Sequence, residues 1–178
     1  DEFQTVHSDA DDLAAILYTS GTTGRSKGAM LSHGNLAANI EVLHKVWDWQ
    51  KGDVLLHALP LFHIHGLFVA AHGALMNGSK MIFLSKFDSD TVVRHLPRCT
   101  LFMGVPTYYV RLLSDAAFDR HACEKIRLFV SGSAPLLTET FESFKEHTGH
   151  TILERYGMSE TGMLTSNPYD GTRKAGTV

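Results

Sequence analysis

Short apolar runs alternate along this chain with stretches whose apolar residues recur at helical spacing. The runs predict strands at 13–19, 53–60, 79–85, 99–105, 125–132 and 151–157. The intervening stretches predict helices at 33–47, 66–77, 88–97, 106–115 and 136–148, with Thr138 as the N-cap of the last. Five strand-to-helix alternations are typical of a parallel sheet with helices on both faces. We therefore predict an α/β fold whose sheet is largely parallel.

Four turns rich in glycine or hydroxyl side chains follow the ends of predicted strands, at 18–28, 60–66, 131–136 and 156–162. Open parallel sheets bind ligands at the carboxyl ends of their strands, which meet at one edge. We therefore expect the four turns to lie together and to form one site.

Composition narrows the class of protein. Of 178 residues, 44% are hydrophobic and 20% are charged, which is typical of a folded domain. The net charge of −3, without a basic run, argues against a general nucleic-acid binder. Cys99 and Cys123 are far apart and outside any C-x-x-C pair, so a disulfide framework is not expected. An intracellular location, with the cytoplasm as the default, follows from this cysteine usage.

The two ends of the sequence are polar. Residues 1–12 form an acidic leader that does not resemble a signal peptide, and "NPYDGTRKAGTV" ends the chain without a closing element. No apolar run approaches the ~20 residues of a membrane span. We expect the chain to be part of a larger protein.

The stretch "LYTSGTTGRSKGAML" is poor in side chains that pack and rich in hydroxyl groups. Backbone N–H groups and hydroxyls in such a turn can surround phosphate oxygens, and Lys27 adds a positive charge. It is not a Walker P-loop, because Ser26 precedes the lysine and Gly28 follows it. The segment therefore indicates a nucleotide phosphate site, and a flexible surface loop is the alternative.

Four motifs occur in a fixed order: "YTSGTTGRSKG", "LPLFHIHG", "SGSAPL" and "ERYGMSETG". Together they resemble the adenylate-forming superfamily of acyl-CoA synthetases, luciferases and peptide-synthetase adenylation domains, over 13–178. Within it, "MGVPTYY" and "SNPYDG" are most similar to malonyl-CoA synthetases. The resemblance implies part of an AMP-binding N-terminal domain, without the ribose-binding aspartate or the mobile C-terminal lid. We expect the chain alone to be nearly inactive.

The resemblance also implies roles for individual residues. The residues at positions that bind the β- and γ-phosphates of ATP are Thr19, Ser20, Gly21, Thr22, Thr23, Gly24 and Lys27. Thr161 would bind the α-phosphate and Glu160 would hold Mg²⁺. The residues placed around the adenine are Gly132, Ser133, Ala134, Pro135, Tyr156 and Gly157. His63 would orient the carboxylate or the transferring phosphate, and His65 would border the acyl pocket.

Arg155 points to the class of acid. A guanidinium in a pocket is costly unless an anion meets it, and it pairs bidentately with a carboxylate. A substrate with a second carboxylate, such as malonate or methylmalonate, would satisfy this need, and Arg111 is a second candidate contact. The alternatives are an internal salt bridge of Arg155 with Glu154 and a solvent-facing Arg111.

The resemblance implies a parent ligase that uses ATP, Mg²⁺ and coenzyme A to convert a carboxylic acid to its acyl-CoA, in the cytoplasm or in mitochondria. A ligase for another short-chain or aromatic acid is one alternative, and a noncatalytic nucleotide-binding module or truncated scaffold is another. A metal site formed by His63, His65, His57 and His72 is a further alternative. For His57 and His72 we expect structural, hydrogen-bonded roles instead.

Overall fold

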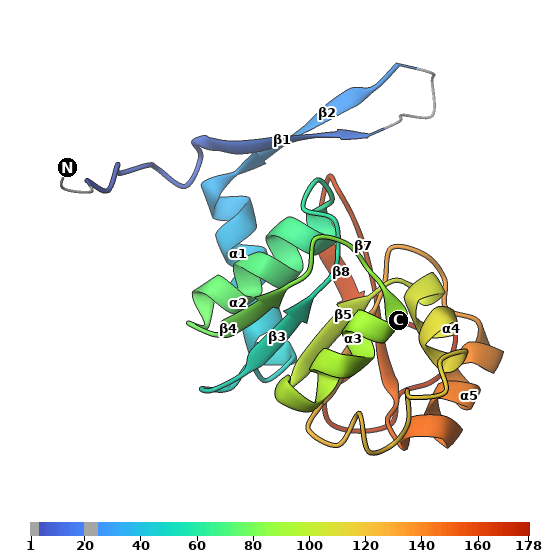
Figure 1. The fold of residues 1–178 in the computed structure, drawn as a ribbon. Helices are drawn as coiled ribbons and strands as arrows, with labels where there is room; N and C mark the ends of the chain where they lie inside the picture. Colours follow the sequence, from blue (N-terminus) through green and yellow to red (C-terminus); the bar gives the residue numbers. More distant parts are fainter. Residues whose placement is uncertain (1–3, 20–24) are drawn as a thin grey trace.

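A six-stranded sheet forms the centre of the molecule, and five of its strands are parallel. The structure, a computed structural model, describes residues 4–19 and 25–178. The sheet order is β4-β3-β5-β6-β7-β8, and β8 runs antiparallel to β7 (Figure 1). The strands are β3 (Val54–His57), β4 (Lys80–Phe83), β5 (Leu101–Gly104), β6 (Leu128–Ser131), β7 (Ile152–Met158) and β8 (Gly162–Ser166). The predicted α/β class is confirmed.

Helices cover both faces of this sheet. The helical elements are α1 (His33–Val46), η1 (His65–Ala71), α2 (His72–Met76), α3 (Ser89–His95), η2 (Leu96–Arg98), α4 (Pro106–Leu113) and α5 (Thr138–Thr148). Successive strand residues point to opposite faces. Leu101 and Met103 of β5 therefore join the core under α1, η1 and α2, whereas Phe102 joins the core under α3, α4 and α5.

The helix boundaries follow the sequence signals in part. Ser32 and Asn35 form a capping box at the start of α1, in which each side chain accepts a hydrogen bond from the other's backbone N–H. The expected Thr138 cap is wrong, because the extended residue before α5 is Leu137 and no side chain caps this helix. The predicted helix 66–77 is divided into the π-helix η1 and α2.

The first predicted strand differs most from expectation. β1 (Leu13–Thr19) pairs antiparallel with β2 (Lys27–Ser32) in a separate hairpin, so its expected place in the parallel sheet is wrong. A short connection joins antiparallel neighbours, whereas a parallel partner needs a long crossover. The hairpin projects from the body, and Tyr18 is 77% exposed, so the strand is not buried as predicted (Figure 1).

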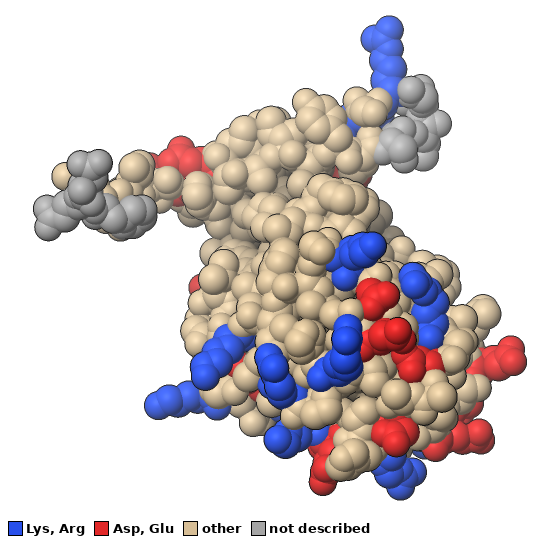
Figure 2. All heavy atoms as spheres, in the orientation of Figure 1, with Lys and Arg blue, Asp and Glu red and all other residues tan. Residues whose placement is uncertain are grey.

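The surface carries charges of both signs on the body of the molecule. Lys and Arg side chains are interspersed with Asp and Glu there, whereas most of the visible hairpin is uncharged (Figure 2). Within 4–19 and 25–178, no helix has both the length and the apolar character needed to cross a membrane.

Candidate active site

Three of the four predicted turns meet at the carboxyl ends of the strands. A cavity of about 470 Å³ is lined by residues from the turn after β3, the turn after β6 and the end of β7. It includes His63, His65, Ser133, Arg155 and Gly157. We call it the Arg155 cavity. Sequence positions more than ninety residues apart are thus brought to one place, as the edge of a parallel sheet predicts.

Arg155 is buried in this cavity without a counter-ion. The residue is 4% exposed, and its Nε and Nη2 atoms find no hydrogen-bond partner among the described residues. Its guanidinium lies against Gly132, where an added Cβ would come 2.3 Å from the Arg155 Cζ. Loss of solvation lowers the pKa of Arg155 to about 10. The site therefore holds a buried cation that an anionic ligand would stabilise.

The predicted alternative, an ion pair between Arg155 and Glu154, is not present in the described part of the chain. Adjacent residues of β7 point to opposite faces of the sheet. A carboxylate oxygen of Glu154 accepts a hydrogen bond from the Gly176 N–H at 3.0 Å instead. Among residues 4–19 and 25–178, no carboxylate forms an ion pair with Arg155.

His65 lies beside Arg155 as a neutral ring. It is 2% exposed, its Nδ1 is 3.3 Å from the Ser133 Oγ, and its Nε2 has no partner within the described chain. Burial, together with the nearby charge of Arg155, lowers the pKa of His65 well below 6.5. Its free ring nitrogen can therefore serve a ligand as an uncharged donor or acceptor near neutral pH.

Ser133 has a backbone conformation that favours glycine. Its φ of 70° lies in the left-handed region, which costs a non-glycine residue about 1–2 kcal/mol. Backbone strain of this kind concentrates at functional sites. Ser133 also lines both the Arg155 cavity and its neighbour, so the strained turn forms the wall between the two.

The hydrogen-bonded roles expected for His57 and His72 gain no support from the described residues. The described residues supply no partner for either ring nitrogen of His57 or for the buried Nδ1 of His72. His57 packs on Phe83 with ring centroids 4.9 Å apart, and burial lowers its pKa below 6.5. Across the described residues, no group of three or more metal-ligating side chains could hold an ion, so the histidine metal site gains no support.

A second cavity, of about 340 Å³, adjoins the first. It brings Ser133, Ala134 and Pro135 to Tyr156 and Gly157, the residues that the resemblance places around the adenine. Gly132 lies beneath Arg155 and does not line this cavity. The segment 176–178 closes another side, held by hydrogen bonds to Glu154 and Asn167. No sequence signal indicated this contribution.

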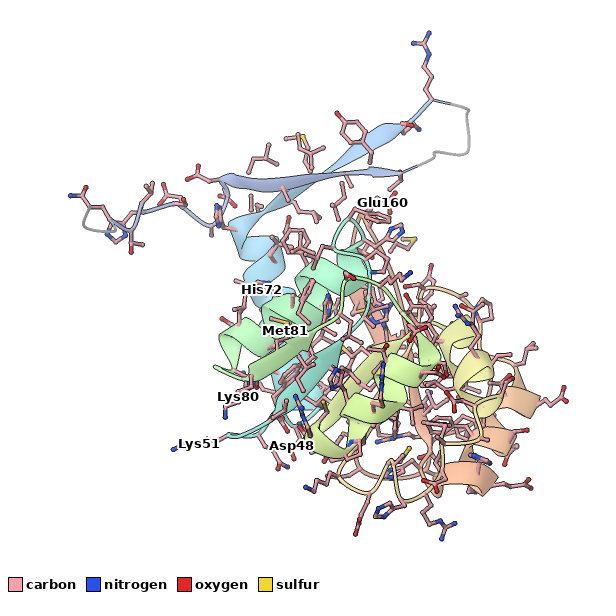
Figure 3. All side chains as sticks on the ribbon, in the orientation of Figure 1. Asp48, Lys51, His72, Lys80, Met81 and Glu160 are labelled. Atoms are coloured by element: carbon pink, nitrogen blue, oxygen red, sulfur yellow. The ribbon has the colours of Figure 1, made fainter. Side chains whose placement is uncertain are left out.

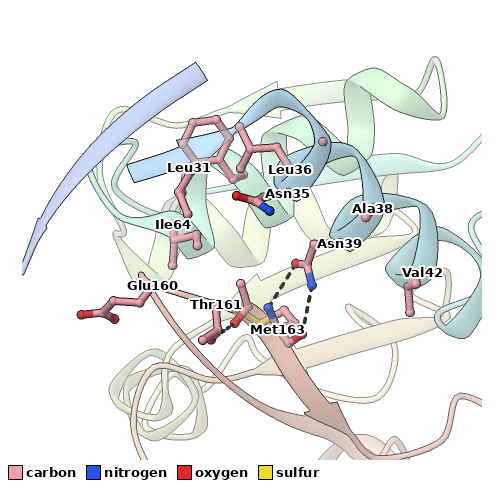
Figure 4. A pocket seen from close by; sticks show the side chains of 13 residues that line it. Leu31, Asn35, Leu36, Ala38, Asn39, Val42, Ile64, Glu160, Thr161 and Met163 are labelled. Atoms are coloured by element: carbon pink, nitrogen blue, oxygen red, sulfur yellow. Dashed lines mark hydrogen bonds between the residues drawn. The ribbon is translucent and has the colours of Figure 1, made fainter. Parts of the chain in front are cut away.

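Glu160 and Thr161 occupy the exposed turn between β7 and β8. They line a third cavity, of about 540 Å³, together with Leu31 of β2 and residues of α1 (Figure 4). Figure 3 shows Glu160 at the edge of the body on the side of the hairpin. The base of the hairpin and this turn are therefore neighbours. Lys27 is exposed on the hairpin, and the predicted phosphate contacts Ser20, Gly21, Thr22, Thr23 and Gly24 lie outside the described residues.

Arg111 lies apart from these cavities. It is exposed on α4, and its guanidinium carbon stands 5.0 Å from the centre of the Phe87 ring, a cation–π contact. It does not line the Arg155 cavity. The solvent-facing alternative for Arg111 fits this position.

The parallel sheet and the cavities at the carboxyl ends of its strands define an α/β domain with a candidate ligand site at this edge. The chain belongs to the AMP-binding enzyme family, whose sequence pattern matches residues 1–178. It is 44% identical to the mitochondrial malonate–CoA ligase ACSF3 of Mus musculus, over 94% of this chain and 32% of that protein. It is 38% identical to the malonate–CoA ligase of Arabidopsis thaliana, over 100% of this chain and 33% of that protein.

Solved structures share the fold. The ATP-bound MatB of Rhodopseudomonas palustris matches with a TM-score of 0.96 and 56% identity, over 99% of this chain and 35% of that one. A malonyl-CoA ligase in a ternary product complex with methylmalonyl-CoA and AMP matches with a TM-score of 0.93 and 40% identity, over 98% of this chain and 39% of that one. The chain thus spans about a third of the length of the relatives it matches.

Proposed function

We propose that this chain is the central part of the large domain of an ATP-dependent acid–CoA ligase. Residues 13–178 would form part of the AMP-binding domain behind the polar leader 1–12, and a C-terminal lid would belong to the rest of the protein. The names of the relatives, malonate–CoA ligase and MatB, support this reaction class. The cytoplasm is still the compartment we propose. Mitochondria are the alternative, which is supported by the word mitochondrial in the name of the mouse relative.

The proposed substrate is malonate or methylmalonate. The observation that carries this choice is the buried Arg155, whose Nε and Nη2 lack partners in a cavity shared with His65. One carboxylate of a dicarboxylic acid would pair with the guanidinium and receive a hydrogen bond from the neutral His65 ring. The other carboxylate would then be held toward His63 and free to react. An apolar acid would leave the buried cation unpaired.

ATP would lie across the neighbouring cavities. The adenine would lie against Ser133, Ala134, Pro135 and Tyr156, and Thr161 would bind the α-phosphate. The loop 19–24 and Lys27 would hold the β- and γ-phosphates, where negative charge increases as pyrophosphate leaves. The acid carboxylate attacks the α-phosphorus to give the acyl-adenylate, and the thiol of coenzyme A then displaces AMP from the acyl carbon.

Glu160 is the residue we propose for Mg²⁺. Its exposed carboxylate and the neighbouring Thr161 hydroxyl are oxygen donors of the kind this ion prefers, and phosphate oxygens would complete the set. When bound, the ion would neutralise charge on the phosphates. The residues present therefore fit the ion.

A panel of acids tests the proposal. The full-length protein is incubated with ATP, Mg²⁺, coenzyme A and one acid at a time, and the acyl-CoA product is identified by mass spectrometry. We expect malonyl-CoA or methylmalonyl-CoA to form fastest. A preference for butyrate or benzoate would establish a ligase for another acid. No acyl-CoA from any acid would favour the noncatalytic nucleotide-binding module.

A further inference from the structure

The side chain of Asn39, in α1, pairs with the backbone of β8. Its Nδ2 donates a hydrogen bond to the Met163 carbonyl at 2.9 Å, and its Oδ1 accepts one from the Met163 N–H at 3.1 Å (Figure 4). One amide thus satisfies both polar groups of a single backbone residue, as a neighbouring strand would. We call this pair of bonds the Asn39 clamp.

The clamp lies at the edge of the sheet. β8 is the last strand in the sheet order, so no strand of the described residues pairs with its outer backbone groups. Gly162, next to the clamp, has a φ of 70°, and an added Cβ there would come 2.7 Å from the Asn39 Oδ1. The close approach of α1 to β8 at this point therefore needs glycine at 162.

A second tie joins the same helix to the same strand further from the turn. The Trp47 indole N–H, at the C-cap of α1, donates to the Ser166 hydroxyl at 2.9 Å. Both ties hold α1 on β8, but only the Asn39 clamp is next to the turn that carries Glu160 and Thr161. Removing one contact at a time can therefore distinguish an effect on the stability of the fold from an effect on the position of the turn.

The clamp connects two segments that the proposed function places around one triphosphate. α1 directly follows β2, the second strand of the hairpin whose loop carries the predicted phosphate contacts. The turn bearing Glu160 and Thr161 directly precedes Gly162, the residue before Met163. Lys27 of the hairpin and the Glu160–Thr161 turn are both exposed, so their separation depends on the contact between α1 and β8.

We propose that Asn39 is a positioning residue for MgATP: it fixes the Glu160–Thr161 turn relative to α1 and to Lys27 of the adjoining strand β2. This inference rests on the proposed function. Loss of the two bonds would let the turn shift, so the effect falls on the binding of MgATP and not on recognition of the acid. A displacement of about 1 Å in a positioned group is enough to cost a large factor in rate.

The test compares three variants of the full-length protein. Asn39→Ala removes the clamp, and Asn39→Asp keeps its volume while replacing the donor with a carboxylate that opposes the Met163 carbonyl. Ser166→Ala, the matched control, removes the hydrogen bond from the Trp47 indole and the one that the Ser166 hydroxyl donates to the Asn167 carbonyl. Thermal unfolding, the Kd for MgATP and the KM values for MgATP and for malonate are measured for each.

We expect both Asn39 variants to weaken MgATP binding by about tenfold, with the KM for malonate within about twofold. Asn39→Ala loses both hydrogen bonds, whereas Asn39→Asp loses the one to the Met163 carbonyl and places a carboxylate against that oxygen. Ser166→Ala should leave the Kd for MgATP unchanged at a similar or smaller loss of stability. Equal MgATP affinity in all three variants, or a malonate KM that rises in parallel, would overturn the positioning role. If the unsubstituted protein binds MgATP but forms no acyl-CoA, the ligase proposal fails while the Kd comparison still decides the clamp.

Discussion

Replacing Arg155 with methionine separates substrate recognition from stability, because the residue is a buried cation with no counter-ion in the described part of the chain. Methionine fills much of the same volume and carries no charge. The fall in the pKa of Arg155 from 12.5 to about 10 corresponds to about 3 kcal/mol of unfavourable charge burial. A substrate carboxylate that pairs with the guanidinium would recover up to this amount, which is on the order of a 100-fold preference.

We therefore expect Arg155→Met to lower kcat/KM for malonate about 100-fold and to change kcat/KM for propionate, which has a methyl group in place of the second carboxylate, by less than about threefold. The same variant should unfold at a higher temperature, since an unpaired buried charge is removed, with a gain of up to about 3 kcal/mol. Pyrophosphate release with each acid and thermal unfolding are the two measurements.

Arg111→Met is the matched control for this experiment. Arg111 is exposed and lies over Phe87, outside the cavity, so its loss should change the malonate-to-propionate ratio by less than about twofold. Equal losses of activity on malonate and propionate in Arg155→Met would refute the dicarboxylate reasoning. A variant that is destabilised by several kcal/mol would refute the unpaired cation.

Three further perturbations test other parts of the site. Gly132→Ala would place a Cβ against the Arg155 Cζ and displace the guanidinium. The ratio of kcat/KM for malonate to kcat/KM for propionate should therefore fall to that of the Arg155→Met variant. An unchanged ratio would mean that the guanidinium can move aside without loss of malonate recognition. Glu160→Gln should raise the Mg²⁺ concentration for half-maximal adenylate formation by about tenfold, and an unchanged magnesium profile would remove this role. Burial lowers the pKa of several histidines, so the unfolded chain binds protons below about pH 6.5 that the folded chain does not. The free energy of unfolding should therefore fall from pH 7 to pH 5, by at most about 1.4 kcal/mol per pH unit for each residue, and His65→Gln should flatten this slope; a flat profile in the unsubstituted protein would contradict the neutral buried rings. These histidines are His57, His65, His72 and His150.

The α/β class could be predicted because the strands of the main sheet are nearly continuous apolar runs, buried on both faces. The hairpin could not be predicted in this way. β1 is as apolar as the central strands, so its exposure leaves no mark on the pattern, and its partner β2 lies within a stretch whose composition indicates a loop. The sequence pattern also did not indicate β8, because its five residues follow the turn after β7 without an apolar run.

The candidate site, like the fold, could be predicted from the sequence only in part. The motifs indicated which turns meet, since each turn follows a strand end and strand ends share an edge. They could not indicate Asn39, which contacts Met163 across 124 positions of sequence through a side chain that is common on helix surfaces. That Glu154 does not pair with Arg155 in the described chain could have been predicted, because both residues lie in the predicted strand 151–157 and a strand directs adjacent side chains to opposite faces.

In the proposed function, the Arg155 cavity and the Glu160–Thr161 turn serve a single reaction between a dicarboxylic acid and ATP. Exchange of radiolabelled pyrophosphate into ATP by the full-length protein, without coenzyme A, measures that reaction alone. We predict that the exchange depends on malonate and is on the order of 100-fold slower with propionate. Exchange of equal rate with both acids, or none with either, would contradict it.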